Sequence, residues 1–269
     1  MVVRLCVAVV VGLAFLAPLY WVLVTSTLSS AQVYDFGWSS VVPHVNWSNY
    51  ARAWSAAPWA RYFGNTVLIA VCTVALALLT SLMAGYAFAV LRFRGRGVLF
   101  AAVLSVMMVP QTVLLIPDYI IAQYLHLLDT YWIQILPWGA SVFGIFLVRQ
   151  FFLGIPPELF EAAEMDGAGA FRMLFAIGLP MVRPALLVLA LNVFMGSWNA
   201  FLWPFIMTSS KSVQPIEVGL ASFYGAAGTD YTGLCAAVTF TTLPILLVFL
   251  ALQKQFVTGA FSAAGGVRG

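Results

Sequence analysis

The sequence predicts an all-α membrane protein with six transmembrane helices. Its 269 residues are 63% hydrophobic and only 8% charged, whereas soluble domains carry about 25% charged residues. Six stretches between charged residues are long enough to cross a bilayer, and the shortest, 130–148, holds 19 residues. A helix needs about 20 apolar residues to cross about 30 Å of hydrocarbon. The predicted spans are about 4–25, 65–91, 98–117, 132–151, 184–207 and 231–253.

The limits of these spans rest on local signals. The first apolar run, 5–24, is longer than a signal-peptide core and no A-x-A site follows it, so we expect a retained span. Pro110 and Pro117 should break or end the third span, because proline removes a backbone donor and clashes with the preceding turn. We expect 118–131 to be a short outside link. The outside segment 26–64 should hold an amphipathic helix at WSNYARAW, capped by Ser48 or Asn49.

The distribution of basic residues sets the orientation. With the N-terminus inside, nine Lys or Arg residues are cytoplasmic and three are outside. The cytoplasmic nine are Arg4, Arg92, Arg94, Arg96, Arg149, Arg172, Arg183, Lys254 and Arg268, and the outer three are Arg52, Arg61 and Lys211. The positive-inside rule therefore places both termini in the cytoplasm. The net charge of +3 is too small to indicate a nucleic-acid partner.

A polar insertion lies between the fourth and fifth spans, at about 156–175 of a single transmembrane domain covering 1–269. Pro157 suits the first position of a helix, and Glu158 and Glu161 fall near the positive end of its dipole. An apolar stripe follows at helical spacing, consisting of Phe160, Ala163, Gly167 and Phe171. A helix lying on lipid is usually rich in Lys and Arg, whereas this one is acidic. The insertion is therefore predicted to dock onto a protein partner at the cytoplasmic surface.

The same insertion carries a family motif. Glu161-Ala162-Ala163, then Gly167, then Ile177-x-Leu179-Pro180 resembles the EAA motif of ABC importer permeases, with every spacing kept. Further matching strings are NTVLIA, YAFAVLRFRGRG, VPQTVLLIPDY, FLVRQFFLGIPPELFEAAEMDGA, WNAFLWP and QKQFV. The final GGVRG departs from a GAVKG-like tail but stays basic. Nearly the whole chain is thus similar to the second permease of carbohydrate-type (maltose- or glycerol-3-phosphate-like) ABC importers.

The resemblance implies a fold, a role and partners. The fold would be that of a type I importer permease in the bacterial inner membrane, and the insertion would be its coupling helix. The docking residues would be Glu161, Ala162, Ala163, Asp166, Gly167 and Arg172. The partners would be a second permease in a heterodimer, two copies of a cytoplasmic ATPase, an extracytoplasmic substrate-binding protein and lipid. ATP and Mg²⁺ would bind the ATPase, because this chain has no G-x-x-x-x-G-K-[ST] sequence, no enzyme site and no cofactor of its own.

Two further groups of residues are candidates for ligand contact. Asn192, Asn199 and Trp203 fall at helical spacing on one face of the fifth span, and amides with aromatic rings suit a neutral polar solute. Ordinary packing between helices accounts for them equally well. In the outside loop 208–230, Lys211, Gln214 and Glu217 could contact the binding protein, and a solvated loop is the alternative.

Competing functions are less compatible with the sequence. A self-contained secondary transporter of a neutral polar solute is the main alternative. Ion-coupled carriers place ionisable residues inside the membrane, but the predicted spans lack them across their centres. No catalytic motif lies in a span, and the three cysteines have no metal-site spacing.

Overall fold

The computed structural model describes residues 2–35, 42, 46–225 and 228–265, although it leaves undescribed the side chains of 2, 3, 248, 249 and 251–265. Trp38, His44 and the basic Arg268 of the GGVRG tail lie outside the described residues, as does the side chain of Lys254. The chain forms two compact units, 1–63 with 215–251, and 64–214 with 252–269.

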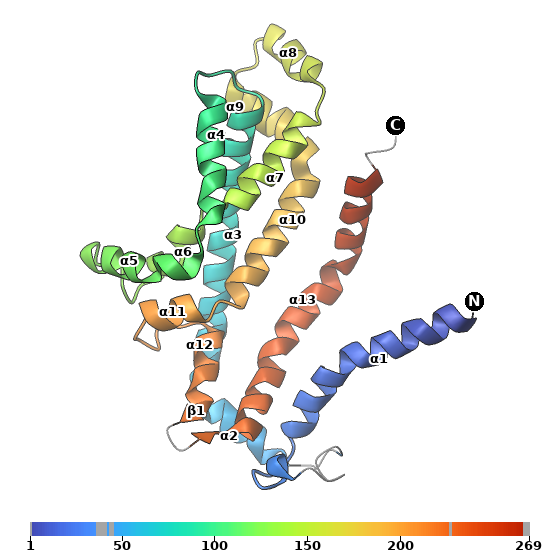
Figure 1. Ribbon diagram of the computed structural model, residues 1–269, viewed down its shortest axis with the longest axis vertical. Coiled ribbons are helices and arrows are strands. Elements are labelled where there is room, and N and C mark those ends of the chain that lie inside the picture. The colour runs from blue at the N-terminus through green and yellow to red at the C-terminus, as the bar shows by residue number, and fades with distance from the viewer. Residues whose placement is uncertain (1, 36–41, 43–45, 226–227, 266–269) are drawn as a thin grey trace. The chain divides into compact units, whose positions relative to one another are not determined.

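The described chain is almost entirely helical (Figure 1). Its α-helices are α1 Val2–Thr25, α2 Ser48–Ala56, α3 Trp59–Ala89, α4 Arg96–Ser105, α5 Gln111–Tyr124, α6 Trp132–Ile135, α7 Val142–Leu153, α8 Pro157–Met165, α9 Ala170–Arg172, α10 Leu179–Trp198, α11 Leu202–Met207, α12 Ile216–Leu220 and α13 Tyr231–Gly265. Shorter 3₁₀ turns are η1 Gln32–Tyr34, η3 Val106–Met108, η4 Leu136–Trp138 and η6 Ala221–Phe223, and η5 Met173–Gly178 is a π-helix. The strands β1 Tyr224–Gly225 and β2 Gly228–Thr229 pair in antiparallel register.

Four described helical stretches are long and apolar enough to cross a membrane: Arg4–Thr25, Trp59–Ala89, Trp132–Leu153 and Ala170–Trp198. They correspond to the first, second, fourth and fifth predicted spans. A bent pair, Arg96–Met108 with Gln111–Tyr124, becomes a fifth if it is counted as one span. The described apolar part of α13, Tyr231–Leu247, is shorter. A membrane protein with several apolar helices is confirmed, and the count of six stays a prediction.

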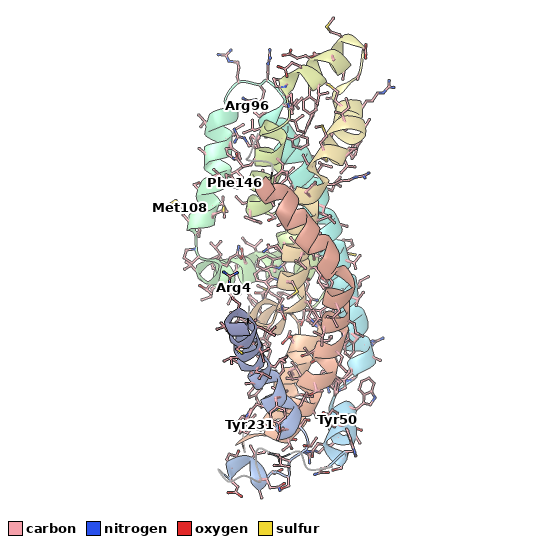
Figure 2. All side chains as sticks on the ribbon, turned by 90° about the vertical axis from the view of Figure 1, so that its right-hand side faces the viewer. Arg4, Tyr50, Arg96, Met108, Phe146 and Tyr231 are labelled. Atoms are coloured by element: carbon pink, nitrogen blue, oxygen red, sulfur yellow. The ribbon has the colours of Figure 1, made fainter. Side chains whose placement is uncertain are left out.

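The third predicted span is a broken helix. The chain bends by 99° between Met108 and Gln111, because Pro110 takes an extended conformation before α5. Figure 2 shows Arg96 and Met108 at the two ends of the helical run before this bend. Pro117 does not end the helix, since it lies inside α5. The outside link therefore begins after Tyr124 rather than at 118, and the predicted boundary was wrong.

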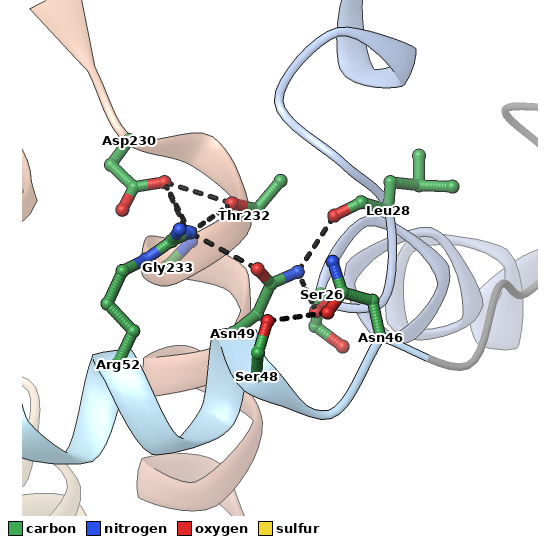
Figure 3. Close-up of polar contacts among 9 residues, drawn as sticks. All are labelled: Ser26, Leu28, Asn46, Ser48, Asn49, Arg52, Asp230, Thr232 and Gly233. Carbon is green, nitrogen blue, oxygen red and sulfur yellow. Dashed lines mark hydrogen bonds and ion pairs between the residues drawn. The ribbon is translucent and has the colours of Figure 1, made fainter.

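In the first unit, a polar cluster joins the end of α1, α2 and the start of α13. Figure 3 shows its members Ser26, Leu28, Asn49, Arg52, Asp230 and Thr232. The buried Asn49 amide donates to the Ser26 and Leu28 carbonyls at 2.9 and 2.8 Å. Arg52 donates to Thr232 at 2.8 Å and to Asp230 at 3.4 Å. Neither Ser48 nor Asn49 caps the helix, because both lie inside α2, whose N-cap Trp47 makes no side-chain cap, and the predicted capping role was wrong.

In the second unit, α3, α7 and α10 pack side by side around one core. Its buried centre includes Leu82, Tyr86, Val148, Phe152 and Leu189. Ser141 caps α7 by accepting a hydrogen bond from the Gly144 backbone at 3.0 Å. This core lies next to α8, the helix of the polar insertion, which stands at one end of the unit (Figure 1).

Candidate functional site

The start of α8 follows directly from its sequence. Pro156 is extended and serves as the N-cap, and Pro157 is the first helical residue, as predicted. Glu158 lies in the first turn, where a carboxylate stabilises the helix dipole. The chain therefore leaves α7, crosses the three non-helical residues 154–156 and begins a new short helix.

The end of α8 is a glycine-dependent turn. Gly167 has a φ of +77°, in the left-handed region where a side chain is strained. The Gly167 N–H bonds to the Glu164 carbonyl at 2.9 Å, and the Ala168 N–H bonds to the Ala163 carbonyl at 2.9 Å. These two bonds define a Schellman motif, which satisfies the last carbonyls of a helix. Gly167 thus reverses the chain immediately after the EAA residues.

This turn corrects the predicted apolar stripe. The stripe requires one helix through 160–171, but α8 ends at Met165 and Phe171 belongs to α9. Phe160 is buried, with 7% of its surface exposed, whereas Phe171 is 69% exposed. Only the first half of the stripe therefore faces the core.

Four of the six predicted docking residues lie together at the exposed end of α8 and the turn after it. We call Glu161, Ala162, Met165, Asp166 and Gly167 the α8 tip. All five are exposed, whereas Ala163 is half-buried against the core. Arg172 is exposed on α9.

Met165 was missed by the sequence reasoning. At 89% exposure it is an unusually bare apolar side chain in the middle of an acidic tip. Its place between the EAA residues and the glycine is the signal that could have found it.

A turn rich in arginine lies beside the α8 tip. Arg92 Nη2 is 3.8 Å from Glu161 Oε1, and both side chains are largely exposed. Exposed ion pairs contribute only about 0–1 kcal/mol, so Glu161 remains available to a stronger partner. Arg96 donates to the Ala89 and Leu91 carbonyls at 3.3 and 3.0 Å, which caps the end of α3. Arg149 donates to Phe88 O at 3.1 Å while its guanidinium stacks 4.2 Å from the Phe100 ring centre.

The predicted substrate-path residues do not share one helix. Asn192 is exposed on α10, Asn199 is the C-cap of that helix, and Trp203 belongs to α11. The prediction of a continuous fifth span to 207 was wrong. Pro204 explains the break, because a proline cannot bond back to residue 200 and clashes with its carbonyl.

Trp203 and Asn199 make local contacts. Trp203 Nε1 donates to Ile133 O at 2.9 Å, and its ring packs edge-on against Trp138 with centroids 5.5 Å apart. Asn199 Nδ2 donates to Met195 O at 2.8 Å and remains exposed. Trp203 therefore has a clear packing role, and Asn192 and Asn199 keep the accessibility that a ligand contact needs.

The segment after α11 is held in place by an acidic clamp. The Asp129 carboxylate accepts the backbone N–H groups of Ser209 and Ser210 at 2.9 and 2.8 Å, and the Ser210 hydroxyl as well. Desolvation alone raises the pKa of Asp129, but these hydrogen bonds outweigh it and hold the pKa below its usual value. The clamp fixes the turn that carries the exposed Lys211.

The three predicted binding-protein contacts have different surroundings. Lys211 is exposed on the clamped turn. Gln214 Nε2 lies 3.5 Å from Thr208 O, and the backbone carbonyl of Gln214 accepts a hydrogen bond from Asn65 Nδ2 at 2.8 Å. Glu217 lies on α12 of the other unit, where burial raises the pKa of its carboxyl. Lys211 is thus the most accessible of the three.

Several apolar helices of membrane length, with the short exposed helix α8 between two of them, match the fold expected from the permease resemblance. The comparisons agree. Residues 77–260 match the family described as the binding-protein-dependent transport system inner membrane component. The chain belongs to this family, and is a multi-pass inner-membrane permease subunit of an ABC importer.

Two relatives and one solved structure show how far the likeness extends. The arabinooligosaccharides transport system permease protein AraQ of Bacillus subtilis is 34% identical over 261 residues, which cover 96% of this chain and 92% of AraQ. The sn-glycerol-3-phosphate transport system permease protein UgpE of Yersinia enterocolitica is 33% identical, covering 94% and 93%. A chain of a bacterial ABC transporter that imports alginate, an acidic polysaccharide, shares the fold with a TM-score of 0.80 at 24% identity, over 95% and 96% of the chains. The family works with a binding protein and an ATPase, so a self-contained secondary transporter is not favoured.

Proposed function

We propose that this permease imports a neutral oligosaccharide or a related sugar, and that its α8 tip receives the movement of a cytoplasmic ATPase. In this proposal the chain is one transmembrane domain paired with a second, different permease. Two ATPase copies hold the ATP and Mg²⁺, so this chain needs no cofactor and catalyses no reaction. A binding protein delivers the sugar from the other side of the membrane.

The exposed α8 tip is the observation that supports ATPase docking. Glu161 and Asp166 supply negative charge, Met165 supplies an apolar knob, and Ala162 and Gly167 are small enough for close approach. The negative charge of this docking surface favours a basic cleft on the partner, and the exposed apolar side chain favours an apolar pocket there. Arg172 on α9 is a flanking contact, and the half-buried Ala163 supports the tip from behind.

The substrate class follows from the relatives and from the available side chains. AraQ is named for arabino-oligosaccharides and UgpE for glycerol 3-phosphate, so the family name alone does not choose between a neutral and an anionic solute. Phosphate recognition relies on Arg or Lys, but Arg149 of α7 is already bonded to Phe88 and stacked on Phe100. The exposed amides of Asn192 and Asn199 suit hydroxyl groups instead. Trp203, which bonds to Ile133 and packs on Trp138, would support the path by packing and would not stack on the sugar.

The outer contact is proposed at Lys211. The Asp129 clamp holds the turn that presents this cation, and an acidic patch on a binding protein would complement it. Gln214 and Glu217 are proposed as secondary contacts. The backbone of Gln214 is held by its hydrogen bond from Asn65, and the carboxyl of Glu217 is half-buried.

Reconstitution tests this function. The permease is placed in proteoliposomes with its partner permease, the ATPase and the binding protein, and ATP hydrolysis is followed while solutes are varied. We expect neutral oligosaccharides to stimulate hydrolysis and accumulate inside, and glycerol 3-phosphate and acidic oligosaccharides to do neither. Stimulation by the anionic solutes alone would contradict the neutral class, and solute uptake without ATP would contradict the ATP-driven role.

A further inference from the structure

We infer that an aromatic relay formed by Phe160, Tyr86 and Phe152 transmits the movement of α8 to the transmembrane helices. This inference rests on the proposed docking of an ATPase to the α8 tip. Docking alone moves only a surface helix, and the spans respond only if something rigid joins them to it. The contacts around α8 identify that joint.

One buried side chain attaches α8 to the core. All nine residues of α8 are described, and Phe160 alone among them is buried. On either side lie short non-helical links, 154–156 and 166–169, so no continuous helix joins α8 to a span. Ala163 touches the same core only with a methyl group. A force on α8 therefore reaches the core mainly through the Phe160 ring.

The Phe160 ring contacts a second aromatic ring, which contacts a third. The Phe160 and Tyr86 ring centroids lie 6.1 Å apart with planes at 61°. Tyr86 in turn lies 5.5 Å from Phe152 at 67°. Such tilted, edge-on pairs have a preferred geometry, and packed interiors transmit displacement rather than absorb it. The relay thus leads from α8 to α3, which carries Tyr86, and to α7, which carries Phe152.

The helices α3 and α7 pack too closely to respond separately. A Cβ placed on Gly85, next to Tyr86, would stand 2.8 Å from Val148 Cγ1 and 3.1 Å from the Arg149 backbone nitrogen. The two helices therefore meet with almost no side chain between them. A push on the Tyr86 ring moves both helices together.

The polar contacts of α8 are poorer candidates for this role. Arg92 and Glu161 are 3.8 Å apart and exposed, so solvent screens them. The Tyr86 hydroxyl is buried with no hydrogen-bond partner among the described residues. The ring of Tyr86, not its hydroxyl, therefore carries the contact, and Tyr86→Phe becomes a matched control.

The test is a double-mutant cycle on coupling. Phe160→Ala, Tyr86→Ala and the double variant are reconstituted with all partners, and solute transported per ATP hydrolysed is measured with ATPase copurification and the thermal midpoint. Tyr86→Phe and Phe160→Leu keep a ring or a bulky side chain. Phe146→Ala removes an exposed phenylalanine from α7.

We expect each alanine variant to keep its ATPase while transport per ATP falls at least about tenfold, which corresponds to about 1.4 kcal/mol of lost coupling. The double variant should be no worse than either single one, because both remove the same contact. Tyr86→Phe and Phe146→Ala should match wild type, and Phe160→Leu should lie between.

Two outcomes overturn the relay. Normal transport per ATP in Phe160→Ala removes its transmitting role. If transport and ATP hydrolysis in Phe160→Leu fall together with the thermal midpoint, and the ratio of solute transported to ATP hydrolysed is unchanged, then Phe160 has a packing role only. A wild-type permease that binds no ATPase refutes the proposed function instead, so the two failures are distinguishable.

Discussion

Gly167 allows the ATPase-docking proposal to be tested with two side chains of nearly equal shape. Gly167→Asn and Gly167→Asp differ by one charge, and both residue types visit the left-handed region more readily than others. In the permease alone a Cβ at this position meets nothing within 4 Å. Only the backbone strain remains, which costs about 1 kcal/mol in either variant. The thermal midpoints of the two purified variants should therefore agree.

Docking should separate the two variants. The basic groups of the proposed cleft are already paired with Glu161 and Asp166, so a third enclosed carboxylate has no partner and costs about 3 kcal/mol, which weakens Kd by about 100-fold. Asparagine adds the same bulk without the charge, so we expect a smaller loss of binding. The assay is titration of the purified ATPase onto each permease in detergent, with uptake measured on the same preparations. Wild-type affinity in Gly167→Asp would show that Gly167 lies outside the docking surface.

Three further predictions concern the other side chains described above. Asp129→Asn should destabilise the permease by about 1–2 kcal/mol, because charged hydrogen bonds to a half-exposed turn are lost. The pKa of Asp129 is lower in the folded protein than its ordinary value. The stability that the ionised carboxylate contributes is therefore fully present above the ordinary pKa and is lost as the pH falls through the folded pKa. The thermal midpoints of wild type and variant should converge below about pH 4. Trp203→Ala should lower the free energy of unfolding by about 2–4 kcal/mol, because the hydrogen bond to Ile133 and the Trp138 contact are lost. Its thermal midpoint, transport and ATP hydrolysis should therefore fall together. A stable variant with impaired transport alone would return Trp203 to the substrate contacts. Asn199→Ala should reduce transport while changing the free energy of unfolding by no more than about 1 kcal/mol. Unchanged transport would remove Asn199 from the path.

The sequence predicted the apolar helices well because their signal is long and redundant. Twenty or more uncharged residues leave few alternatives to a span, so α1, α3 and α10 were recognisable. Boundaries depend on single residues and are weaker. The third span was predicted to end at 117, just before the carboxylate of Asp118, but one carboxylate does not stop a helix, and α5 runs through it to Tyr124.

Two errors had readable signals. Counting the apolar stripe through Gly167 ignored that Asp-Gly is a common end of a helix, and the positive φ of Gly167 shows that end. Extending the fifth span to 207 ignored Pro204, which prevents bonding back to residue 200.

The aromatic relay had no such signal. Tyr86 and Phe160 are far apart in the chain, and nothing in either local pattern selects one as the neighbour of the other. Only the packing of α3, α7 and α8 reveals that pairing.

The polar cluster that joins α1, α2 and α13 has a consequence for biosynthesis. Arg52 and Asp230 are 178 residues apart in the chain. Ribosomes add about 5–20 residues per second, so Arg52 waits about 10–35 s for its partner to be made. During that interval Asn49 still has Ser26 and Leu28 as neighbours, and the guanidinium can donate to Asn49 Oδ1, but it lacks Thr232 and Asp230. The first unit is therefore completed only after α13 has begun to be made, and a ribosome that stalls before α13 leaves a nascent permease whose beginning is still unfinished.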